Sequence, residues 1–467
     1  MRKVYIHNRT MIKYRKEKHM SSEQIDFGSN HVRRSVLSVA APMLVAQLIN
    51  LLYNIIDRIY IGRIPGEGST ALAGLGLCFP VITMVTASAN LFGTGGSPLC
   101  SIARGKGDMK TARSIMNNAC FSLVLTGILI TLLGILFHKP LLYLFGASDR
   151  LYPYASGYML IYLLGTVFVM ISLGLNPYIN CQGFARTGMK TVLLGAVCNL
   201  ILDPVFIFGF HMGVKGAAIA TILSQFFSAL WVLFFLTGKH AELTLDFKGF
   251  RPDFACITEI IKLGISSFVM SFTNGLVQIA CNSMLQIYGG DLYITVMTVL
   301  NSVREIASAP VLSIADGASP IISYNYGADQ ITLMKKAIRF MSQLGIGYTV
   351  CIWGLISLFP EFFIGIFNRD PSLMLKAVPA MHIYFFGFCM MAFQFTGQSV
   401  FKALGRAKHA VFFSILRKAI IVTPLTLILP HIGGLGVNGV FLAEPISNVI
   451  GGLACYLTMR QTVLKKL

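Results

Sequence analysis

The chain has 467 residues, of which 55% are hydrophobic and only 12% are charged, and its mean hydropathy is +0.69. This composition is too apolar and too poor in charge for a soluble globular protein, so it predicts an integral membrane protein. The formal net charge of +19 does not indicate nucleic-acid binding, because the basic residues lie in short stretches between apolar segments. The ten cysteines have no regular spacing and predict neither disulfides nor metal ligands.

The N-terminal residues are polar and basic, and the first long apolar run covers residues 36–61. That run is longer than the apolar core of a signal peptide, so we expect it to be retained as a membrane span. We therefore interpret residues 1–32 as a cytoplasmic N-terminal extension. Met11 and Met20 are alternative start sites.

A bilayer core of about 30 Å is crossed by about 20 apolar residues in a helix. The chain contains twelve segments of this kind, which predict an all-α membrane protein with twelve transmembrane helices. The expected spans are 36–61, 71–97, 114–137, 154–181, 189–210, 214–237, 256–287, 293–323, 337–359, 374–402, 409–430 and 435–459.

Most of the 38 Lys and Arg residues lie in the two terminal segments and in the connections that follow even-numbered spans. Two of these connections, near 104–113 and 335–339, are expected to be basic loops. Cytoplasmic loops are enriched in Lys and Arg, so both termini are predicted to be cytoplasmic. Four further basic residues fall inside predicted spans and are expected to snorkel or to form ion pairs: Arg58, Arg304, Arg417 and Lys418.

An internal repeat is visible in the sequence. The segment G-G-S-P-L-C-S from Gly95 matches G-A-S-P-I-I-S from Gly317, and the glycines that follow these segments, Gly105 and Gly327, are separated by the same interval. A second match, at nearly that interval, pairs G-V-K-G at 213–216 with G-V-N-G at 436–439.

The repeat predicts two pseudo-symmetric lobes of six helices each. Since six is even, the lobes have parallel topology and are related by an axis along the membrane normal. We predict an N-terminal lobe at 33–238 and a C-terminal lobe at 254–467, joined by a cytoplasmic linker at 239–253. Transporters built in this way place their sites between or within the repeats.

Asn199 and Asp203 lie one helical turn apart in the sequence N-L-I-L-D-P and therefore face the same way. An Asp at the centre of a span costs about 2.5–3.5 kcal/mol even on a lenient insertion scale, which indicates a function. Its best candidate partner is Asp57, because two carboxylates in a dry site readily bind a cation or a proton. The hydroxyl of Thr221 could join this site, and Pro204 permits a bend beside it.

Two polar stripes follow helical spacing on the repeat-related first and seventh spans. Either stripe would be costly against lipid, so we expect both to face one wettable cavity. The alternative is that their side chains join helices through hydrogen bonds. The first stripe is Gln47, Asn50, Asn54 and Asp57, and the second is Ser267, Ser271, Asn274, Gln278, Asn282 and Gln286.

Three other acidic residues fall inside predicted spans. Glu305 and Asp316 share one face of the eighth span, where they either bind substrate cations or pair with Arg304 or Arg417. Glu444 precedes a proline on the twelfth span and is interpreted as structural. The histidines show no metal-ligand spacing, so no metal site is predicted beyond a possible Na+ at the coupling-ion site.

The motifs in hand resemble those of the multidrug and toxic compound extrusion (MATE) family. They are N-x-x-x-D-P at 199–204, Y-N-I-I-D-R-I-Y-I-G-R-I-P-G from Tyr53 and G-A-S-P-I-I-S-Y-N-Y-G-A from Gly317. The resemblance covers the chain from about residue 33 and is nearest to the bacterial multidrug-export branch. It implies two V-shaped lobes around a central cavity, and exchange of cytoplasmic drug for external H+ or Na+.

The resemblance also implies an ion site in the N-terminal lobe. Tyr158 is the weaker match at the tyrosine position, where Tyr162 could replace it. In one branch of the family, the resemblance implies a Glu on the seventh helix and an Asp on the tenth. Here Asn274 stands at the first position, and the tenth span has no acid. The sequence therefore does not favour a sodium site in the C-terminal lobe. The matching residues of the N-terminal site are Asp57, Asn199, Asp203, Thr221 and Tyr158.

We therefore expect a cation-coupled antiporter that exports amphipathic, often cationic, drugs and uses no cofactor. It is expected to act as a monomer in the plasma membrane.

A flippase for lipid-linked or polysaccharide substrates is the nearest alternative, but it should show a cavity rich in Arg and Lys, whereas the stripes are neutral or acidic. An enzyme is disfavoured because H-E-x-x-H and G-x-S-x-G are absent from the sequence. A passive channel is disfavoured by the repeat and the buried acids. The expected cavity residues are Gln47, Asn50, Asn54, Ser271, Asn274, Gln278 and Asn282.

Overall fold

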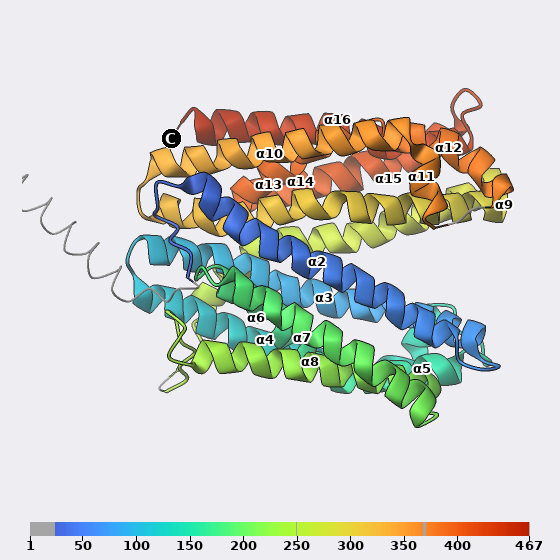
Figure 1. Cartoon of the computed structure of the whole chain (residues 1–467), viewed down its shortest axis with the longest axis horizontal. Helices are drawn as coiled ribbons and strands as arrows, with labels where there is room; N and C mark the ends of the chain where they lie inside the picture. The colour runs from blue at the N-terminus through green and yellow to red at the C-terminus, as the bar shows by residue number, and fades with distance from the viewer. Residues whose placement is uncertain (1–23, 249, 368–369, 467) are drawn as a thin grey trace, which may run out of the picture.

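The computed structural model describes residues 24–248, 250–367 and 370–466, and the regular structure in these ranges is helical (Figure 1). The N-terminal extension predicted at 1–32 therefore lies largely outside the described residues. The first half comprises α2 (Val32–Gly62), α3 (Gly68–Gly105), α4 (Met109–Leu144), α5 (Tyr152–Leu164), α6 (Thr166–Asn180), α7 (Ala185–Pro204), the π-helical turn η1 (Val205–Gly209) and α8 (Gly213–Thr237).

The second half repeats this plan with more interruptions. It comprises α9 (Phe254–Gly327), α10 (Ile331–Leu358), α11 (Pro360–Gly365), α12 (Pro371–Phe385), η2 (Phe388–Met390), α13 (Met391–Ala403), α14 (Ala407–Ile415), the π-helical η3 (Leu416–Val422), α15 (Thr423–Ile428), η4 (Leu429–His431), α16 (Val437–Met459) and η5 (Arg460–Leu464).

The helices account for twelve membrane spans. Ten helical stretches in the described residues are long and apolar enough to cross a bilayer, and α5 with α6 forms an eleventh span, bent by 57°. The long α9 is two helices, because the backbone of Gly290 is non-helical, with φ 69° and ψ −168°. Only glycine adopts such a conformation readily, so the chain changes direction there. The prediction of an all-α protein with twelve spans is confirmed.

The basic loop expected near 104–113 is much shorter than predicted. Arg104 lies in the last turn of α3, and α4 begins at Met109, so only residues 106–108 connect the two helices. The cluster at 335–339 likewise lies inside α10. The predicted ends were wrong because hydropathy falls where polar residues begin, whereas a helix can continue beyond the hydrocarbon layer.

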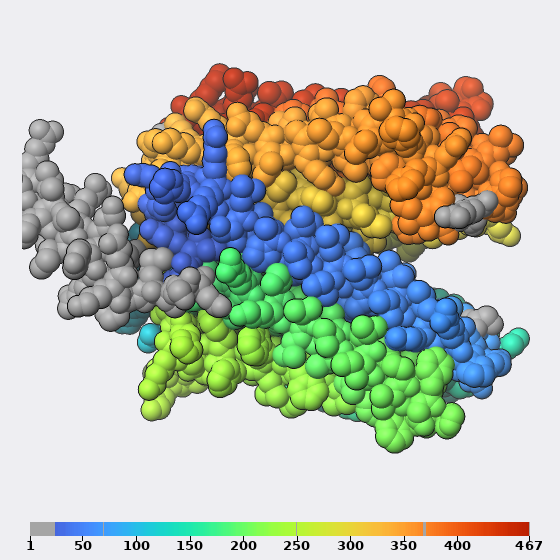
Figure 2. Space-filling view, in the orientation of Figure 1, coloured from blue at the N-terminus to red at the C-terminus, as the bar shows by residue number. Residues whose placement is uncertain are grey.

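The helices form two groups, the N-terminal lobe (α2–α8) and the C-terminal lobe (α9–α16). Each lobe has an apolar core, one around Leu163 and Tyr178 and another around Phe385 and Phe441, and a third cluster packs the start of α2 against the second lobe. The lobes lie together at the end that carries the C-terminus and separate toward the opposite end, where Figure 2 shows a hollow between α2 and the helices of the second half. The molecule is therefore open at one end.

The closed end contains a reciprocal crossing of α3 and α9, which we call the glycine crossing. Gly105 faces the backbone carbonyl of Tyr324, and Gly327 faces that of Ile102, so that a Cβ added at either glycine would overlap the facing oxygen. The two glycines occupy equivalent positions in the sequence repeat. The repeated glycines thus allow the backbones of α3 and α9 to touch.

A second contact at this end centres on the buried Arg104. Its guanidinium donates to the carbonyl of Cys181 and pairs with Glu242, which lies in the segment between α8 and α9. Gln24 donates to the same carboxylate at 2.8 Å. The ring of Tyr324 in the other lobe lies 5.7 Å from the guanidinium carbon. One side chain thereby joins both lobes to the inter-lobe segment.

Candidate functional site

Helices α2 and α7 pack against each other and bring Asp57 and Asp203 together. The two carboxylates lie within hydrogen-bonding reach of each other. Asp203 is fully buried, and the side-chain amide of Asn199 donates to its Oδ1 at 3.2 Å. Oδ1 of Asp57 and Oδ2 of Asp203 are both buried with no hydrogen-bond partner among the described residues. We call Asp57 and Asp203 the carboxylate pair.

The carboxylate pair has the chemistry of a site for a small positive ion. Two ionised carboxylates accept hydrogen bonds and donate none, so neither can satisfy the other. A proton or a cation between them would partner the oxygens and remove the repulsion of like charges. Arg58, the next residue on α2, is within electrostatic reach of Asp57, but its guanidinium lies over the ring of Phe79, 5.0 Å from the centroid, and it forms no ion pair within 4.0 Å with either carboxylate among the described residues.

Three tyrosines surround the carboxylate pair. Tyr158 on α5 is buried, lies close to Thr221 on α8 and is within electrostatic reach of Asp57. Tyr162 stacks on Tyr158, with ring centroids 6.1 Å apart. The structure thus brings together all five residues that the sequence predicted for the ion site. Their role as ion ligands stays a prediction.

Tyr53 is a neighbour of the site that sequence reasoning missed. Its ring lies on α2, one helical turn before Asp57, and is within electrostatic reach of both carboxylates. The spacing of four residues was a usable signal, because side chains at i and i+4 share a helix face. Tyr53 and Tyr158 therefore approach the carboxylate pair from two different helices.

The polar stripe on α2 faces the gap between the lobes only in part. Gln47 accepts a hydrogen bond from Ser313 of the other lobe at 3.1 Å. Asn54 donates to the carbonyl of Asn50 in its own helix at 2.8 Å, and Asn50 is exposed. Gln47 thus fits the alternative interpretation, in which a polar side chain joins two helices.

The stripe on α9 lies beside a cavity of about 360 Å³ in the C-terminal lobe. Asn274 and Gln278 line it, and Gln278 accepts from Asn301 and donates to Asn282, each at 3.0 Å. Ser271 instead donates to the carbonyl of Ser267 in its own helix. None of the residues predicted on α2 lines this cavity, so it is not the single shared cavity that we expected.

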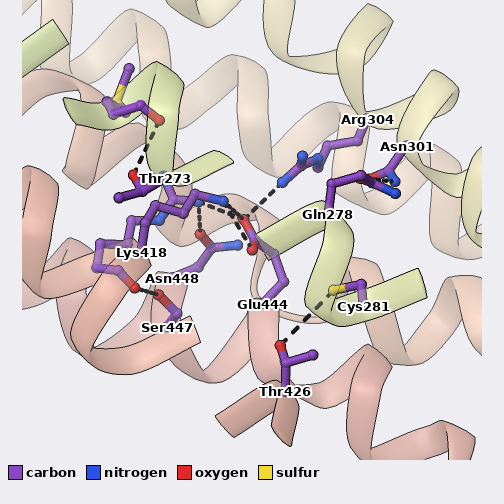
Figure 3. A network of polar contacts seen from close by, with 12 residues as sticks. Thr273, Gln278, Cys281, Asn301, Arg304, Lys418, Thr426, Glu444, Ser447 and Asn448 are labelled. Atoms are coloured by element: carbon purple, nitrogen blue, oxygen red, sulfur yellow. Dashed lines mark hydrogen bonds and ion pairs between the residues drawn. The ribbon is translucent and has the colours of Figure 1, made fainter. Parts of the chain in front are cut away.

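Three basic side chains converge on one carboxylate in this cavity, which we call the basic cavity (Figure 3). Glu444 on α16 accepts from Arg304 of α9 at 2.8 Å. It also accepts from Arg417 at 2.7 Å and from Lys418 at 3.1 Å, both on η3. The four charged groups come from three separate spans. Of the two outcomes expected for basic residues inside spans, snorkelling or pairing, these three residues show pairing.

Pairing of the two arginines with Glu305 or Asp316 was one of two expected alternatives, and the described residues do not show it. Arg304 and Arg417 pair with Glu444 rather than with Glu305 or Asp316. Successive residues on a helix point in different directions, so Glu305 does not follow Arg304 toward α16. Asp316 lies elsewhere, in a cavity of about 200 Å³ that Lys402 also lines. The polar stripes did not reveal the basic cavity because its charges come from other faces and other helices.

Comparison with known proteins identifies the fold family. The MatE family model matches residues 42–205 and 266–428, which together make up more than half of the chain. The chain belongs to the MatE family. The two matched ranges are nearly equal in length and lie one in each lobe, so the model matches each half of this MatE protein once.

Individual relatives agree with this assignment. The multidrug export protein MepA of Staphylococcus haemolyticus (strain JCSC1435) is 24% identical over 418 residues, which cover 89% of this chain and 91% of that protein. MepA of Staphylococcus aureus (strain NCTC 8325 / PS 47) is 23% identical over 440 residues, covering 94% and 97%. The outward-facing structure of a multidrug resistance MATE family transporter of the MOP superfamily is 21% identical, with a TM-score of 0.89 over 96% of this chain and 100% of that one.

In this MatE protein the fifth span of each lobe contributes to a polar site: α7 carries Asp203 of the carboxylate pair, and η3 carries Arg417 and Lys418 of the basic cavity. Each site also lies beside a change from α- to π-helical hydrogen bonding. In the first lobe, η1 follows Pro204, and in the second, η3 precedes Pro424. A proline supplies no amide hydrogen to the helix, and π-helical turns are frequent at functional sites. The bend predicted at Pro204 thus takes the form of an altered helical pitch.

Proposed function

We propose that this MatE protein exports amphipathic drugs from the cytoplasm in exchange for H+ or Na+. The observation that carries the proposal is the carboxylate pair, in which Asp57 and Asp203 each keep a buried oxygen without a partner among the described residues. A cation satisfies both groups at once. The relatives named as multidrug export proteins support drugs as the substrate class. Export across the bacterial plasma membrane by a monomer, with both termini cytoplasmic, completes the proposal.

The coupling follows from the cost of burying charge. Two bare carboxylates are incompatible with a closed site of low dielectric constant, so the lobe that carries them closes only after a cation has bound. In the outward-open state the pair captures the cation, and the helices that carry Asp57 and Asp203 then repack and release the drug. In the inward-open state, drug binding accompanies release of the cation. The amide of Asn199 keeps Asp203 oriented throughout.

The first test replaces Asp203 by Asn in protein reconstituted into vesicles. Asp203→Asn keeps the shape of the side chain but removes the charge that binds the cation, so we expect gradient-driven drug export to be abolished. Export is measured under separately imposed proton and sodium gradients, which also identifies the coupling ion. Glu259→Gln is the matched control, because Glu259 is an exposed acid that pairs with the exposed Lys262 at 2.7 Å, away from the carboxylate pair.

Normal export by Asp203→Asn would contradict this mechanism. Equal export with and without either gradient in the unmodified protein would indicate a passive channel instead. Loss of export in both Asp203→Asn and Glu259→Gln would show that the change from acid to amide acts through insertion or folding. The amount of protein in the membrane is therefore measured for each variant.

A flippase for lipid-linked or polysaccharide substrates is the second candidate. The sequence disfavoured it because no polar stripe was basic, but Arg304, Arg417 and Lys418 line one cavity in the structure. Guanidinium and ammonium groups bind phosphates well. Translocation of a fluorescent pyrophosphate-linked lipid in the same vesicles separates the candidates, because a drug antiporter leaves that lipid where it is.

A further inference from the structure

The basic cavity holds more positive than negative charge. Its lining contains three basic residues, Arg304, Arg417 and Lys418, and two acidic ones, Glu305 and Glu444. Glu444 alone accepts hydrogen bonds from all three basic side chains. Glu305 is exposed and forms no ion pair within 4.0 Å with another described residue. One carboxylate is thus the shared ion-pair partner of three cations.

The excess charge is buried. Arg417 and Lys418 are each only 5% exposed, and Nε of Arg417 has no hydrogen-bond partner among the described residues. An unpaired charge inside a membrane protein is costly, and such residues commonly mark a substrate or ion path. The cavity therefore contains a hydrogen-bond donor without a partner, the Nε–H of Arg417, and surplus positive charge, and burial of either raises the free energy of the folded protein.

The remaining lining suits an amphipathic molecule. Met270, Met297, Met391 and Phe395 supply an apolar, adaptable wall. Asn274 and Gln278 supply amide groups from α9, and Arg304 is the most accessible of the three cations, with 27% of its side chain exposed. An apolar wall with a few convergent polar groups is the usual composition of a small-molecule site.

We propose that the basic cavity binds an anionic group, such as a carboxylate, on the exported molecule. This inference rests on the proposed export function and narrows its substrate class to amphipathic molecules that carry a negative group. The side chains of Arg304 and Lys418 and the free Nε–H of Arg417 are the donors for that group, while the methionines contact its apolar ring system. The carboxylate pair in the other lobe stays available for the coupling cation.

The test compares two dyes that differ by one charge: a rhodamine with a free carboxylate and its methyl ester. Binding of each dye to the purified full chain in detergent is measured by fluorescence anisotropy. In Lys418→Met, Glu444 keeps both arginine partners, so the ion-pair cluster survives with one cation fewer. We expect Lys418→Met to weaken binding of the acid at least about tenfold, as for the loss of one charged hydrogen bond, and to leave the ester unchanged.

Two further variants complete the test: one at a second basic residue of the cavity and one at an exposed lysine outside it. Arg304→Gln also leaves Glu444 with two cations and is expected to act in the same direction, which covers the case that Lys418→Met does not fold. Lys262→Met removes an exposed lysine of α9 that lies outside the cavity and is the matched control. An unchanged ratio of acid to ester affinity in both cavity variants, or failure of the unmodified protein to bind the acid, would overturn the proposal.

Binding and transport failures are distinguishable in this design. If the protein binds the rhodamine acid with the expected dependence on Lys418 but exports neither dye under any gradient, the proposed export function is wrong and the anionic subsite stands. If it exports the ester under a gradient while Lys418→Met leaves the affinity ratio unchanged, export stands and the anionic subsite is wrong.

Discussion

The two lobes share one backbone plan but differ in the charge of their polar sites. In the N-terminal lobe, Asp57 and Asp203 face each other with two buried oxygens left over. In the C-terminal lobe, the carboxylate of Glu444 is surrounded by three cations. The two glycines of the crossing occupy equivalent positions in the two repeats, whereas the charged residues of the two polar sites differ. The repeat therefore fixes how the helices pack, while the chemistry within each lobe is free to diverge.

The difference has a thermodynamic meaning. The carboxylate pair is an incomplete arrangement that a positive ion completes, so removal of one of its charges relieves repulsion. The cluster around Glu444 is an ion-pair network, in which removal of the central charge leaves cations buried without a counter-charge. The same acid-to-amide change should therefore have opposite effects on the stability of the two lobes.

The largest expected effect follows from breaking the network in the C-terminal lobe. Glu444→Gln leaves Arg417 and Lys418 buried without a carboxylate and should lower the free energy of unfolding by about 3–5 kcal/mol. The measurement is thermal unfolding of the detergent-solubilised protein, in which aggregation on heating reports the loss of the folded state.

Asp203→Asn is the matched change in the other lobe. It removes one of two like charges and keeps the side chain's size, so we expect its unfolding temperature to be no lower than that of the unmodified protein. Equal destabilisation by Asp203→Asn and Glu444→Gln would show that the two sites do not differ in the way described.

An intermediate effect is expected at the glycine crossing, where the lobes are symmetric. Gly105→Ala and Gly327→Ala each place a Cβ against a backbone carbonyl, and overpacking of this kind costs about 1–3 kcal/mol. Because the contact is reciprocal, the two variants should have similar unfolding temperatures. Gly354→Ala is the control, because a Cβ at that helical position meets no atom within 4 Å.

The glycine prediction fails if either crossing variant is as stable as Gly354→Ala. A large difference in unfolding temperature between Gly105→Ala and Gly327→Ala would show that the two glycines, although equivalent in the sequence repeat, do not contribute equally to the packing of α3 against α9.

The smallest expected effect concerns the two stacked tyrosines of the N-terminal lobe. Tyr158→Phe removes a buried hydroxyl that lies within electrostatic reach of Asp57. Loss of one hydrogen-bonding group at the ion site costs about 1 kcal/mol, so the coupling cation should bind about fivefold more weakly. Tyr162→Phe should have less effect. The half-saturating concentration of the coupling ion in vesicle export measures both, and a larger shift for Tyr162→Phe would reverse the assignment of the two rings.

Much of the fold was predictable because a bilayer imposes strong rules on a sequence. Apolar length alone located the twelve spans, and the repeat in G-x-S-P segments indicated two related halves. The residues around Asp203 were predictable for a similar reason, since a carboxylate inside a span is too costly to be incidental. Asn199 and Asp203 are linked by helical spacing, which can be read from one segment.

The basic cavity was not predictable in the same way. Arg304, Arg417 and Glu444 come from three spans, and a single sequence does not show which faces of those spans meet. Glu305 and Arg304 are adjacent in sequence, which made them appear to be natural partners, yet helical geometry sends them in different directions. The helix ends were also missed, because α3 continues through Arg104, beyond the point where hydropathy falls.

The glycine crossing has a consequence for movement between states. At Gly105 and Gly327 one backbone rests on another with no side chain of either glycine between them, so nothing is interlocked there. Interlocked side chains resist sliding, whereas smooth surfaces permit the small shear displacements by which packed helices rearrange. We therefore expect α3 and α9 to glide past each other at this point with a low barrier, while the contact of the Arg104 guanidinium with the Tyr324 ring of α9 must be lost as they do.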